Sequence, residues 1–311
     1  MILCVTLNPS WDVTHVCRGW NSGGVVRVEQ TFAVPGGKGI NVARGLHDLG
    51  RETFCLGFVG GPTGLLVRQG LSSQELPGRW IEVRDNTRTN FTVSDPDTGE
   101  ELHSVEPGPE IDSVQWKLFR QSYESAVAEA ECVVLAGSLP RGLPPTAYAE
   151  LVRLARAREV RTLVDCAGQA LQAAVQAKPW AIKPNRKELQ QLADRELLDL
   201  PAVVRTAREL VQAGIELLAV TMGPDGGAVI SANEAWHASP PAVAVVNTVG
   251  CGDAFVAGLL HASFSALSLA DQLRWAVAAG TANVTVSSPG TVPTTVHEIL
   301  ARIYVRCVDS G

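Results

Sequence analysis

The sequence predicts an α/β protein built on a mostly parallel, doubly wound sheet with helices on both faces, and a small sheet standing off it as a lid. Two observations predict the large sheet: apolar strands alternate with helices from residue 112 onward, and such repeats favour parallel pairing. A third observation predicts the small sheet. Segments near 12–34 and 87–106 alternate polar and apolar residues, as strands do when one face meets water.

Length, charge and hydropathy narrow the class of protein. A chain of 311 residues fits one α/β domain, and we expect residues 1–311 to form a single domain with both alternating segments inserted in it. The net charge of -6, with scattered basic residues, argues against a nucleic-acid partner. No apolar run is long enough to span a membrane, and the chain opens on an apolar strand. We expect a cytoplasmic protein with no membrane partner.

The cysteines and histidines show no metal-binding pattern. Seven cysteines and six histidines are widely spread, without a C-x-x-C pair. An odd number of distant cysteines indicates reduced, mostly buried thiols. Cys251 alone stands at the start of a predicted helix, where the pKa of a thiol could fall and make it oxidisable. A small residue filling space beside a tight turn is the commoner explanation.

The first strand of the large sheet is predicted at residues 2–7, which are almost wholly apolar. A continuous run of this kind is typical of a strand that is covered on both faces. Asp12 follows soon after the strand ends, where α/β sheets bind their ligands. A second apolar strand is predicted at 54–61, and a helix follows at 63–71.

A glycine-rich loop, Pro35–Gly39, leads into an amphipathic helix. Its glycines let the backbone approach a ligand closely, and Lys38 and Asn41 add a charge and an amide there. A flexible loop with a solvated lysine is the alternative.

The small sheet is predicted from two separate stretches. Residues 12–16 alternate polar and apolar side chains, and 23–34 is an irregular strand-like stretch that contains Arg27. Residues 87–94 alternate in the same way and return over 101–105 as a β-hairpin, with Pro and Gly in the turn.

The remaining elements alternate regularly. The predicted helices are 112–129, 145–158, 168–176, 186–192, 201–213, 253–266, 270–286 and 294–307, and the predicted strands are 132–136, 161–165, 181–185, 217–221 and 242–246. Polar residues and glycines recur where strands end, and the carboxyl ends of parallel strands share one edge, so we expect one ligand crevice to collect them. These residues are Ser138, Asp165, Asn185, Gly223 and Gly250–Asp253.

The chemistry is predicted at the turn before the helix at 253–266. Gly250-Cys251-Gly252 lets backbone N–H groups converge at the positive end of a helix, which favours binding of an anion. A carboxylate there would repel a phosphate, unless Asp253 takes a proton from a hydroxyl that attacks a bound phosphoryl group. The structural alternative is that Asp253 only complements the helix dipole.

Two common phosphate-binding motifs are excluded. A dinucleotide fingerprint at this turn would need a third glycine at position 255, which is Phe255. A P-loop ending at Lys38 would need Gly at position 32 and Ser or Thr at position 39, where the chain has Phe32 and Gly39.

Lys183-Pro184-Asn185 ends another predicted strand. Asn185 can cap the next helix together with Glu188, a capping box that is a sufficient structural reason for both residues. The same amide and carboxylate at the mouth of the crevice could instead hold, through water, a Mg²⁺ that phosphates bind.

Six motifs, in this order, resemble those of the ribokinase-like sugar kinases, and within them the phosphofructokinase B branch of the 1-phosphofructokinase and tagatose-6-phosphate kinase type. Each motif alone is weak evidence, but the series spans nearly the whole chain. The resemblance implies a three-layer α/β/α core and a lid that often mediates dimerisation, so we expect a homodimer. The motifs are Thr6–Pro9 with Asp12, Gly36–Ala43, Thr87–Asn90, Gly137–Pro140, Lys183–Asn185 with Glu188, and Thr248–Asp253.

The resemblance also implies a site that uses ATP and Mg²⁺. Asp253 resembles the base for the acceptor hydroxyl, and the amides of Gly250, Cys251 and Gly252 would hold the transferred phosphoryl group. Mg²⁺ is linked to Asn185 and Glu188 through water. The other implied positions bind the substrate (Asp12, Arg27, Gly37, Lys38, Asn41, Arg88, Asn90 and Ser138) or the nucleotide (Lys183, Asn185, Thr221, Gly223, Gly226 and Asn283).

The implied activity is ATP-dependent phosphorylation of a ketohexose phosphate. Lys38 and Pro179-Trp180 favour fructose 1-phosphate, giving fructose 1,6-bisphosphate. Phe91-Thr92-Val93 lacks the lysine usual in 1-phosphofructokinases, so tagatose 6-phosphate and fructose 6-phosphate stay open. The alternatives are a non-catalytic sugar-phosphate sensor, which an intact Gly-x-Gly-Asp argues against, and a ribokinase or nucleoside kinase acting on an uncharged acceptor.

Overall fold

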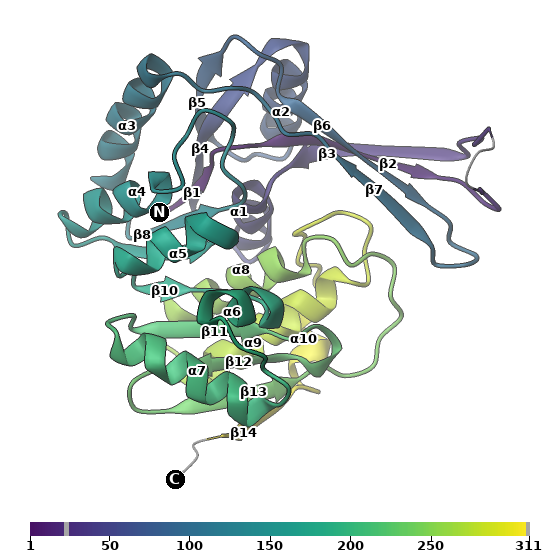
Figure 1. The fold of residues 1–311 in the computed structure, drawn as a ribbon. Helices are drawn as coiled ribbons and strands as arrows, with labels where there is room; N and C mark the ends of the chain where they lie inside the picture. Colours follow the sequence, from purple (N-terminus) through teal and green to yellow (C-terminus); the bar gives the residue numbers. More distant parts are fainter. Residues whose placement is uncertain (22–24, 309–311) are drawn as a thin grey trace.

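A ten-stranded sheet forms the centre of the computed structural model, which describes residues 1–21 and 25–308. Its strands are β1 (Ile2–Thr6), β4 (Thr53–Gly60), β5 (Gly78–Val83), β8 (Cys132–Ala136), β9 (Arg161–Asp165), β10 (Ala181–Ile182), β11 (Leu217–Thr221), β12 (Gly227–Ile230), β13 (Ala235–Ser239) and β14 (Tyr304–Cys307). Their order is β14-β13-β12-β11-β10-β9-β8-β1-β4-β5 (Figure 1). Pairing is parallel from β5 to β11 and antiparallel from β11 to β14.

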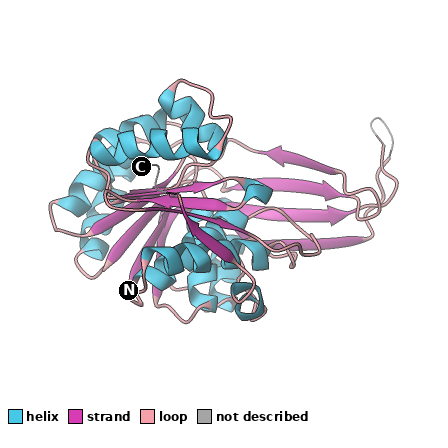
Figure 2. Ribbon diagram, turned by 90° about the horizontal axis from the view of Figure 1, so that it is seen from below, coloured by secondary structure: helices cyan, strands magenta, loops and turns pink. Residues whose placement is uncertain are grey.

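Helices cover both faces of this sheet, as the alternation of strands and helices predicts (Figure 2). One core cluster joins the strands to α3 (Ser113–Val127), α4 (Ala147–Arg156), α5 (Gly168–Gln176), α6 (Arg186–Ala193) and α7 (Leu200–Gln212). The other cluster joins them to α1 (Lys38–Asp48), α2 (Gly61–Ser73), α8 (Cys251–Ser263), α9 (Leu269–Asn283) and α10 (Val296–Leu300). In β1 Leu3 and Val5 belong to the first cluster, whereas Ile2 and Cys4 belong to the second. Strand alternation therefore explains why every residue of β1 is buried.

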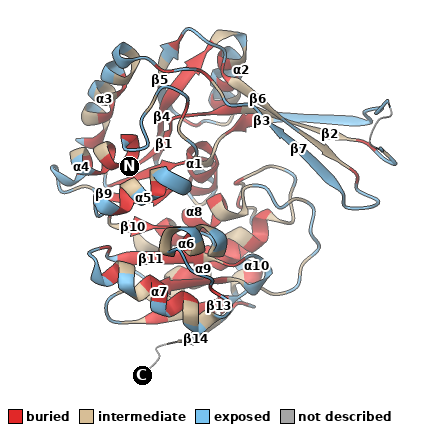
Figure 3. Cartoon of the chain, viewed as in Figure 1, coloured by how far each residue is buried: buried red, intermediate tan, exposed pale blue. Residues whose placement is uncertain are grey.

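The predicted small sheet is present and projects from one edge of the core (Figures 1 and 3). It consists of β3 (Gln30–Gly36), β2 (Ser10–Val16), β6 (Arg88–Ser94) and β7 (Glu101–Val105), in that order. Its root is where Ser10 pairs with both Gly36 and Arg88, and its outer end is where Val16 pairs with Gln30. The predicted residues 23 and 24 lie outside the described part of the chain.

The strand predicted at 242–246 is wrong. This segment has no regular secondary structure, and Val245 and Val246 are 66% and 58% exposed. The N–H groups of Val246 and Asn247 instead share the carbonyl of Val284 at the end of α9. A β-branched run favours an extended backbone, but here that backbone crosses the surface from β13 to α8 and joins no sheet.

The long helix predicted at 294–307 is also wrong. It is replaced by the short helix α10 and by β14, which pairs antiparallel with β13. The strands β5, β12 and β13 were not predicted, since β5 and β13 mix apolar with polar residues and β12 has four residues. Within the described residues no helix is long and apolar enough to cross a membrane.

Candidate active site

The start of α8 presents a set of unused backbone N–H groups. Gly250 precedes the helix with φ of 84°, a left-handed conformation that favours glycine. A Cβ at this position would lie 2.3 Å from the nitrogen of Gly290, so no larger residue fits. The N–H of Asp253 bonds the carbonyl of Gly250, but among the described residues no hydrogen bond uses the N–H groups of Gly250, Cys251 or Gly252. These three groups form an open anion cradle.

Asp253 lies directly beside this cradle. Its side chain is buried, with 5% exposure, and Asn41 Nδ2 donates to its Oδ2 at 2.8 Å. Burial raises the pKa of Asp253 to about 6, and the nearby charge of Asp165 adds to the rise, while Lys38, Asn41 and Lys183 oppose it. A carboxylate with this pKa is ionised at neutral pH and still basic enough to accept a proton.

Asp165 is a second buried carboxylate in this region. The sequence predicts its position at a strand end but assigns it no function. It ends β9, is fully buried, and its Oδ1 accepts from Lys38 Nζ at 2.7 Å. Lys183 Nζ lies 3.2 Å from its other oxygen, Oδ2, as an ion pair. Burial opposes ionisation of Asp165, but Lys183 and Lys38 outweigh it and lower the pKa of this carboxyl.

Lys183 also lies over the anion cradle. A Cβ built on Gly252 would be 3.5 Å from Lys183 Nζ, so the ammonium group sits within contact distance of the cradle. The cradle therefore combines N–H donors, the positive end of a helix and one buried cation.

The thiol of Cys251 behaves differently from a typical cysteine at a helix start. Burial, with a further contribution from the charge of Asp253, raises the pKa of Cys251 to about 11. The pKa of Cys251 therefore rises and does not fall, which agrees with the explanation that a small residue fills space beside the turn.

The root of the small sheet brings a second group of predicted residues next to α1. Asp12 and Asn90 are paired in register, and Asn90 Nδ2 donates to Asp12 Oδ1 at 2.8 Å. Arg88 donates to the carbonyls of Asn8 and Glu106, and its Nε is buried without a partner. Burial lowers the pKa of the Arg88 guanidinium. This root therefore offers a carboxylate, an amide and an incompletely satisfied cation to a polar ligand.

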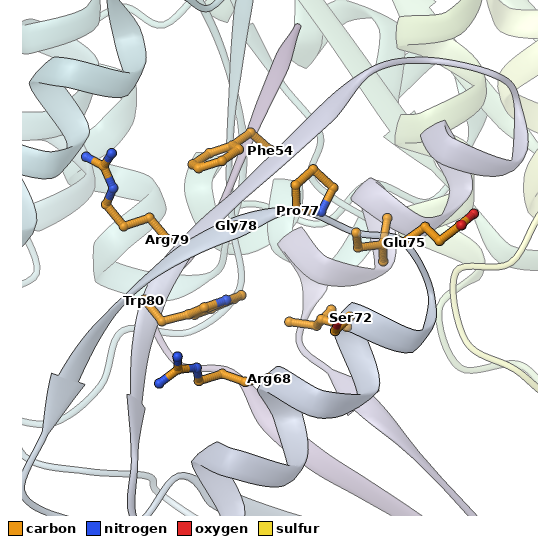
Figure 4. A pocket seen from close by; sticks show the side chains of 10 residues that line it. Phe54, Arg68, Ser72, Glu75, Pro77, Gly78, Arg79 and Trp80 are labelled. Atoms are coloured by element: carbon orange, nitrogen blue, oxygen red, sulfur yellow. The ribbon is translucent and has the colours of Figure 1, made fainter.

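A hollow of about 480 Å³ lies beside Lys38, at the loops that follow β8 and β9. Lys38, Ser138, Arg141 and Glu188 are among its lining residues. A larger hollow of about 820 Å³, at the amino ends of β4 and β5, contains none of the predicted site residues (Figure 4). The chemistry therefore points to the smaller hollow.

The predicted nucleotide residues lie at the ends of neighbouring strands. Asn185 and Thr221 form a parallel bridge, and Gly223 begins the short turn after β11 that Gly226 ends. Asn185 and Glu188 also form the predicted capping box, with bonds of 2.8 and 2.9 Å.

Two predicted residues are not brought into this group. Asn283 is fully buried, and its amide donates to the carbonyls of Ser288 and Thr291, so it holds a loop. Arg27 lies close to Glu29, whose N–H bonds Val16 at the outer end of the small sheet. The residues brought together are Asp12, Gly37, Lys38, Asn41, Arg88, Asn90, Ser138, Lys183, Asn185, Glu188, Thr221, Gly223, Gly226, and Gly250–Asp253.

Comparison with known proteins places this chain and its fold among carbohydrate kinases. Residues 7–295 match the family described as pfkB family carbohydrate kinase. The chain is similar to the 1-phosphofructokinase of Bacillus subtilis (strain 168), with 35% identity over 94% of this chain and 95% of that protein. It is also similar to the 1-phosphofructokinase of Escherichia coli (strain K12), with 33% identity over 93% and 92%.

The solved structure of phosphofructokinase-2 from Escherichia coli in complex with substrates and products superposes with a TM-score of 0.91, at 30% identity and with 97% and 98% of the two chains covered. Fold and sequence thus agree on a phosphotransferase with a sugar acceptor. The chain belongs to the pfkB family of carbohydrate kinases.

The Asp165 network can be tested through stability. Replacing Asp165 with Asn should lower the free energy of unfolding by about 3–5 kcal/mol, because it leaves the buried Lys183 ammonium without its counter-ion. Urea unfolding at pH 7 measures this loss. Asp97→Asn, which removes a solvent-exposed partner of Arg18, should cost little. Equal losses in the two variants would contradict the role of Asp165.

Proposed function

We propose that this protein is an ATP-dependent kinase that phosphorylates a ketohexose phosphate, and that fructose 1-phosphate is its substrate and fructose 1,6-bisphosphate its product. One observation carries the kinase chemistry: the buried carboxylate of Asp253, held by Asn41, lies beside three unused N–H groups. The 1-phosphofructokinases similar to nearly the whole chain support the choice of acceptor.

The proposed reaction uses these groups in one displacement. Asp253 takes the proton of the acceptor hydroxyl as its oxygen bonds to the γ-phosphorus of ATP, and the bond between that phosphorus and the ADP oxygen breaks. The N–H groups of Gly250, Cys251 and Gly252, with Lys183, stabilise the negative charge on the transferred group. Lys38, which bonds Asp165, lies close enough to Asp253 to favour its ionised form. The proton then leaves Asp253 for solvent with the products.

The residues fit a Mg²⁺ that is bound mainly by ATP. Within the described chain no group of three or more His, Cys, Asp or Glu side chains could enclose a metal, which is consistent with ligands from phosphates and water. Glu188 lines the hollow, and the buried Asp165 Oδ2, whose partner is Lys183 Nζ at 3.2 Å, has capacity for a further interaction. We propose Glu188 and Asn185 as the side chains that hold the metal through water. The ion would neutralise phosphate charge when bound.

We further propose that the small sheet acts as a lid and forms the contact of a homodimer. Its residues Phe32, Phe91, Leu102 and Val105 are 40–66% exposed, more apolar surface than a solvated two-faced sheet needs. A related structure is described as a tetrameric inhibited form of the Escherichia coli phosphofructokinase-2. The buried, free thiols of Cys4, Cys55, Cys132 and Cys166 support a reducing compartment, the cytoplasm.

Replacing Asp253 with Asn should lower kcat by about 10²–10⁴-fold and leave the KM for ATP within a few fold, because the general base is lost. In the wild type, kcat should fall as the pH drops below about 6, where the carboxylate becomes protonated. A coupled assay of ADP release between pH 5 and 8 measures both. Asp271→Asn removes the matching first-turn acid of α9 and should keep full activity. Full activity of the Asp253 variant would contradict the proposal.

The acceptor can be identified with the same assay over fructose 1-phosphate, fructose 6-phosphate, tagatose 6-phosphate and fructose. We expect the highest kcat/KM with fructose 1-phosphate. Arg88→Ala should raise the KM for the sugar phosphate about 10- to 100-fold, as expected for a lost charge-assisted bond to phosphate. Arg84→Ala, a change of an exposed arginine nearby, is the control. An unchanged KM in the Arg88 variant would favour an uncharged acceptor, and absence of ADP with every sugar would favour a sensor.

Sedimentation velocity tests the proposed dimer. Phe32 and Phe91 lie on opposite faces of the small sheet, since Phe32 pairs with Thr14 and Phe91 with Val13. Phe32→Asp or Phe91→Asp should convert the dimer to a monomer, and the effective variant identifies the contacting face. Leu198→Asp changes an exposed leucine between α6 and α7 and should keep the dimer. A wild-type monomer, or dimers in both variants, would exclude this contact.

A further inference from the structure

Arg44 is a buried cation that the proposed reaction does not use. It lies in α1, one turn after Asn41, and is 5% exposed. Burial lowers the pKa of its guanidinium, although Asp48, Cys55, Asp12 and Asp253 all oppose that change. Burying a cation is costly unless its donors are paired, so the partners of Arg44 indicate what its position achieves.

Each nitrogen of the guanidinium has an acceptor in a different part of the fold. Nη1 donates to Asn41 Oδ1 at 2.9 Å and to the carbonyl of Pro289. Nη2 donates to the carbonyl of Pro35 at 2.7 Å, and Nε donates to Gln74 Oε1 at 3.0 Å. Three of these four acceptors adjoin the site.

The bond to Asn41 determines which end of its amide faces Asp253. Arginine has only donors, so the amide oxygen of Asn41 must face Arg44 and its NH₂ group must face Asp253. A reversed amide would place its oxygen against the Asp253 carboxylate. Arg44 therefore selects the one orientation in which Asn41 stabilises the ionised carboxylate.

Two of the other three bonds connect Arg44 to the small sheet and to the loop beneath the anion cradle. Pro35 lies at the root of the small sheet, where it pairs with Trp11. Pro289 precedes Gly290, whose nitrogen packs against Gly250 under the anion cradle. One guanidinium thus contacts the small sheet, the support of the cradle and the partner of the base.

We propose that Arg44 is a positioning residue that orients Asn41 toward Asp253 and ties the root of the small sheet and the loop beneath the anion cradle to that orientation. Arg44 then holds both the small sheet and the partner of Asp253. A displacement of the sheet would therefore change the orientation of Asn41 toward Asp253. This inference rests on the proposed kinase chemistry.

The test is Arg44→Met, which keeps length and removes charge and donors. We expect kcat to fall on the order of 10²-fold with the KM for ATP little changed, because a base held out of place loses its alignment. An isotope-edited NMR titration of the ligand-free protein should show the pKa of Asp253 rising. Removing a cation and an aligned donor both disfavour its charged form, while Asp165, Lys38 and Lys183 remain.

Three further variants keep this test decisive. Arg51→Met removes an arginine that holds the far end of α8 through the carbonyl of His261 and should leave the pKa of Asp253 unchanged. Arg44→Lys should recover part of kcat. If the Met variant does not fold, kcat and the pKa of Asp253 are measured in the Lys variant instead. Asn41→Ala combined with Arg44→Met should cost no more than the worse single change, because one residue acts through the other.

An unchanged or lowered pKa of Asp253 in the Arg44 variants, or additive losses in the double variant, would overturn the proposal. Absence of kinase activity in the wild type would instead refute the proposed function, and the titration would still decide the role of Arg44.

Discussion

Two buried carboxylates share two ammonium groups at the carboxyl end of the sheet, and the chemistry of the site depends on how that charge is divided. Asp165 takes both Lys38 and Lys183 as close partners, whereas Asp253 receives only the amide of Asn41. The pKa of Asp165 is therefore lowered and that of Asp253 is raised. One acid becomes a permanent counter-ion, and the other becomes able to exchange a proton near neutral pH. A difference of this kind between neighbouring acids separates structural from reactive roles.

The fold brings these charges together because parallel strands end at the same edge. Asp165 ends β9, Lys183 follows β10, and Lys38 begins the helix that packs over β1. Asp253 arrives from the other end of the chain, 212 residues after Asn41. Helices on both faces exclude water from the strands, so the Lys183–Asp165 ion pair, with side chains 3% and 0% exposed, lies in a region of low polarity where each charge has a large effect. The small sheet is rooted at Ser10, which follows β1 and pairs with Gly36 and Arg88.

Much of this organisation can be predicted from sequence. Apolar runs such as 2–7 locate the buried strands, and the alternating segments locate the small sheet, because both patterns follow directly from which faces are covered. The strand predicted at 242–246 is wrong because a β-branched apolar run indicates only an extended backbone. Such a backbone can cross the surface without joining a sheet. The short strands β12 and β13 have too few residues for a clear period.

A site residue can be predicted from sequence when its type and its position relative to strands and helices leave few possible functions. Gly250–Asp253 is such a stretch, since glycines, a helix start and an acid coincide. Arg44 could not be found this way, because on a helix an arginine ordinarily faces solvent, and its role depends on partners at positions 35, 41, 74 and 289. Asn283 shows a further limit of sequence: its type suits ligand binding, but the carbonyls that its amide bonds, those of Ser288 and Thr291, are set by the course of a loop.

The protonated state of Cys251 makes its thiol resistant to oxidation by peroxides. Peroxides attack thiolates, and a thiol with a pKa of about 11 is almost wholly neutral inside a cell. The same desolvation that keeps Asp253 basic therefore shields the adjoining sulfur from becoming a sulfenic acid. A cysteine can therefore occupy the turn before α8 without making this turn sensitive to oxidation.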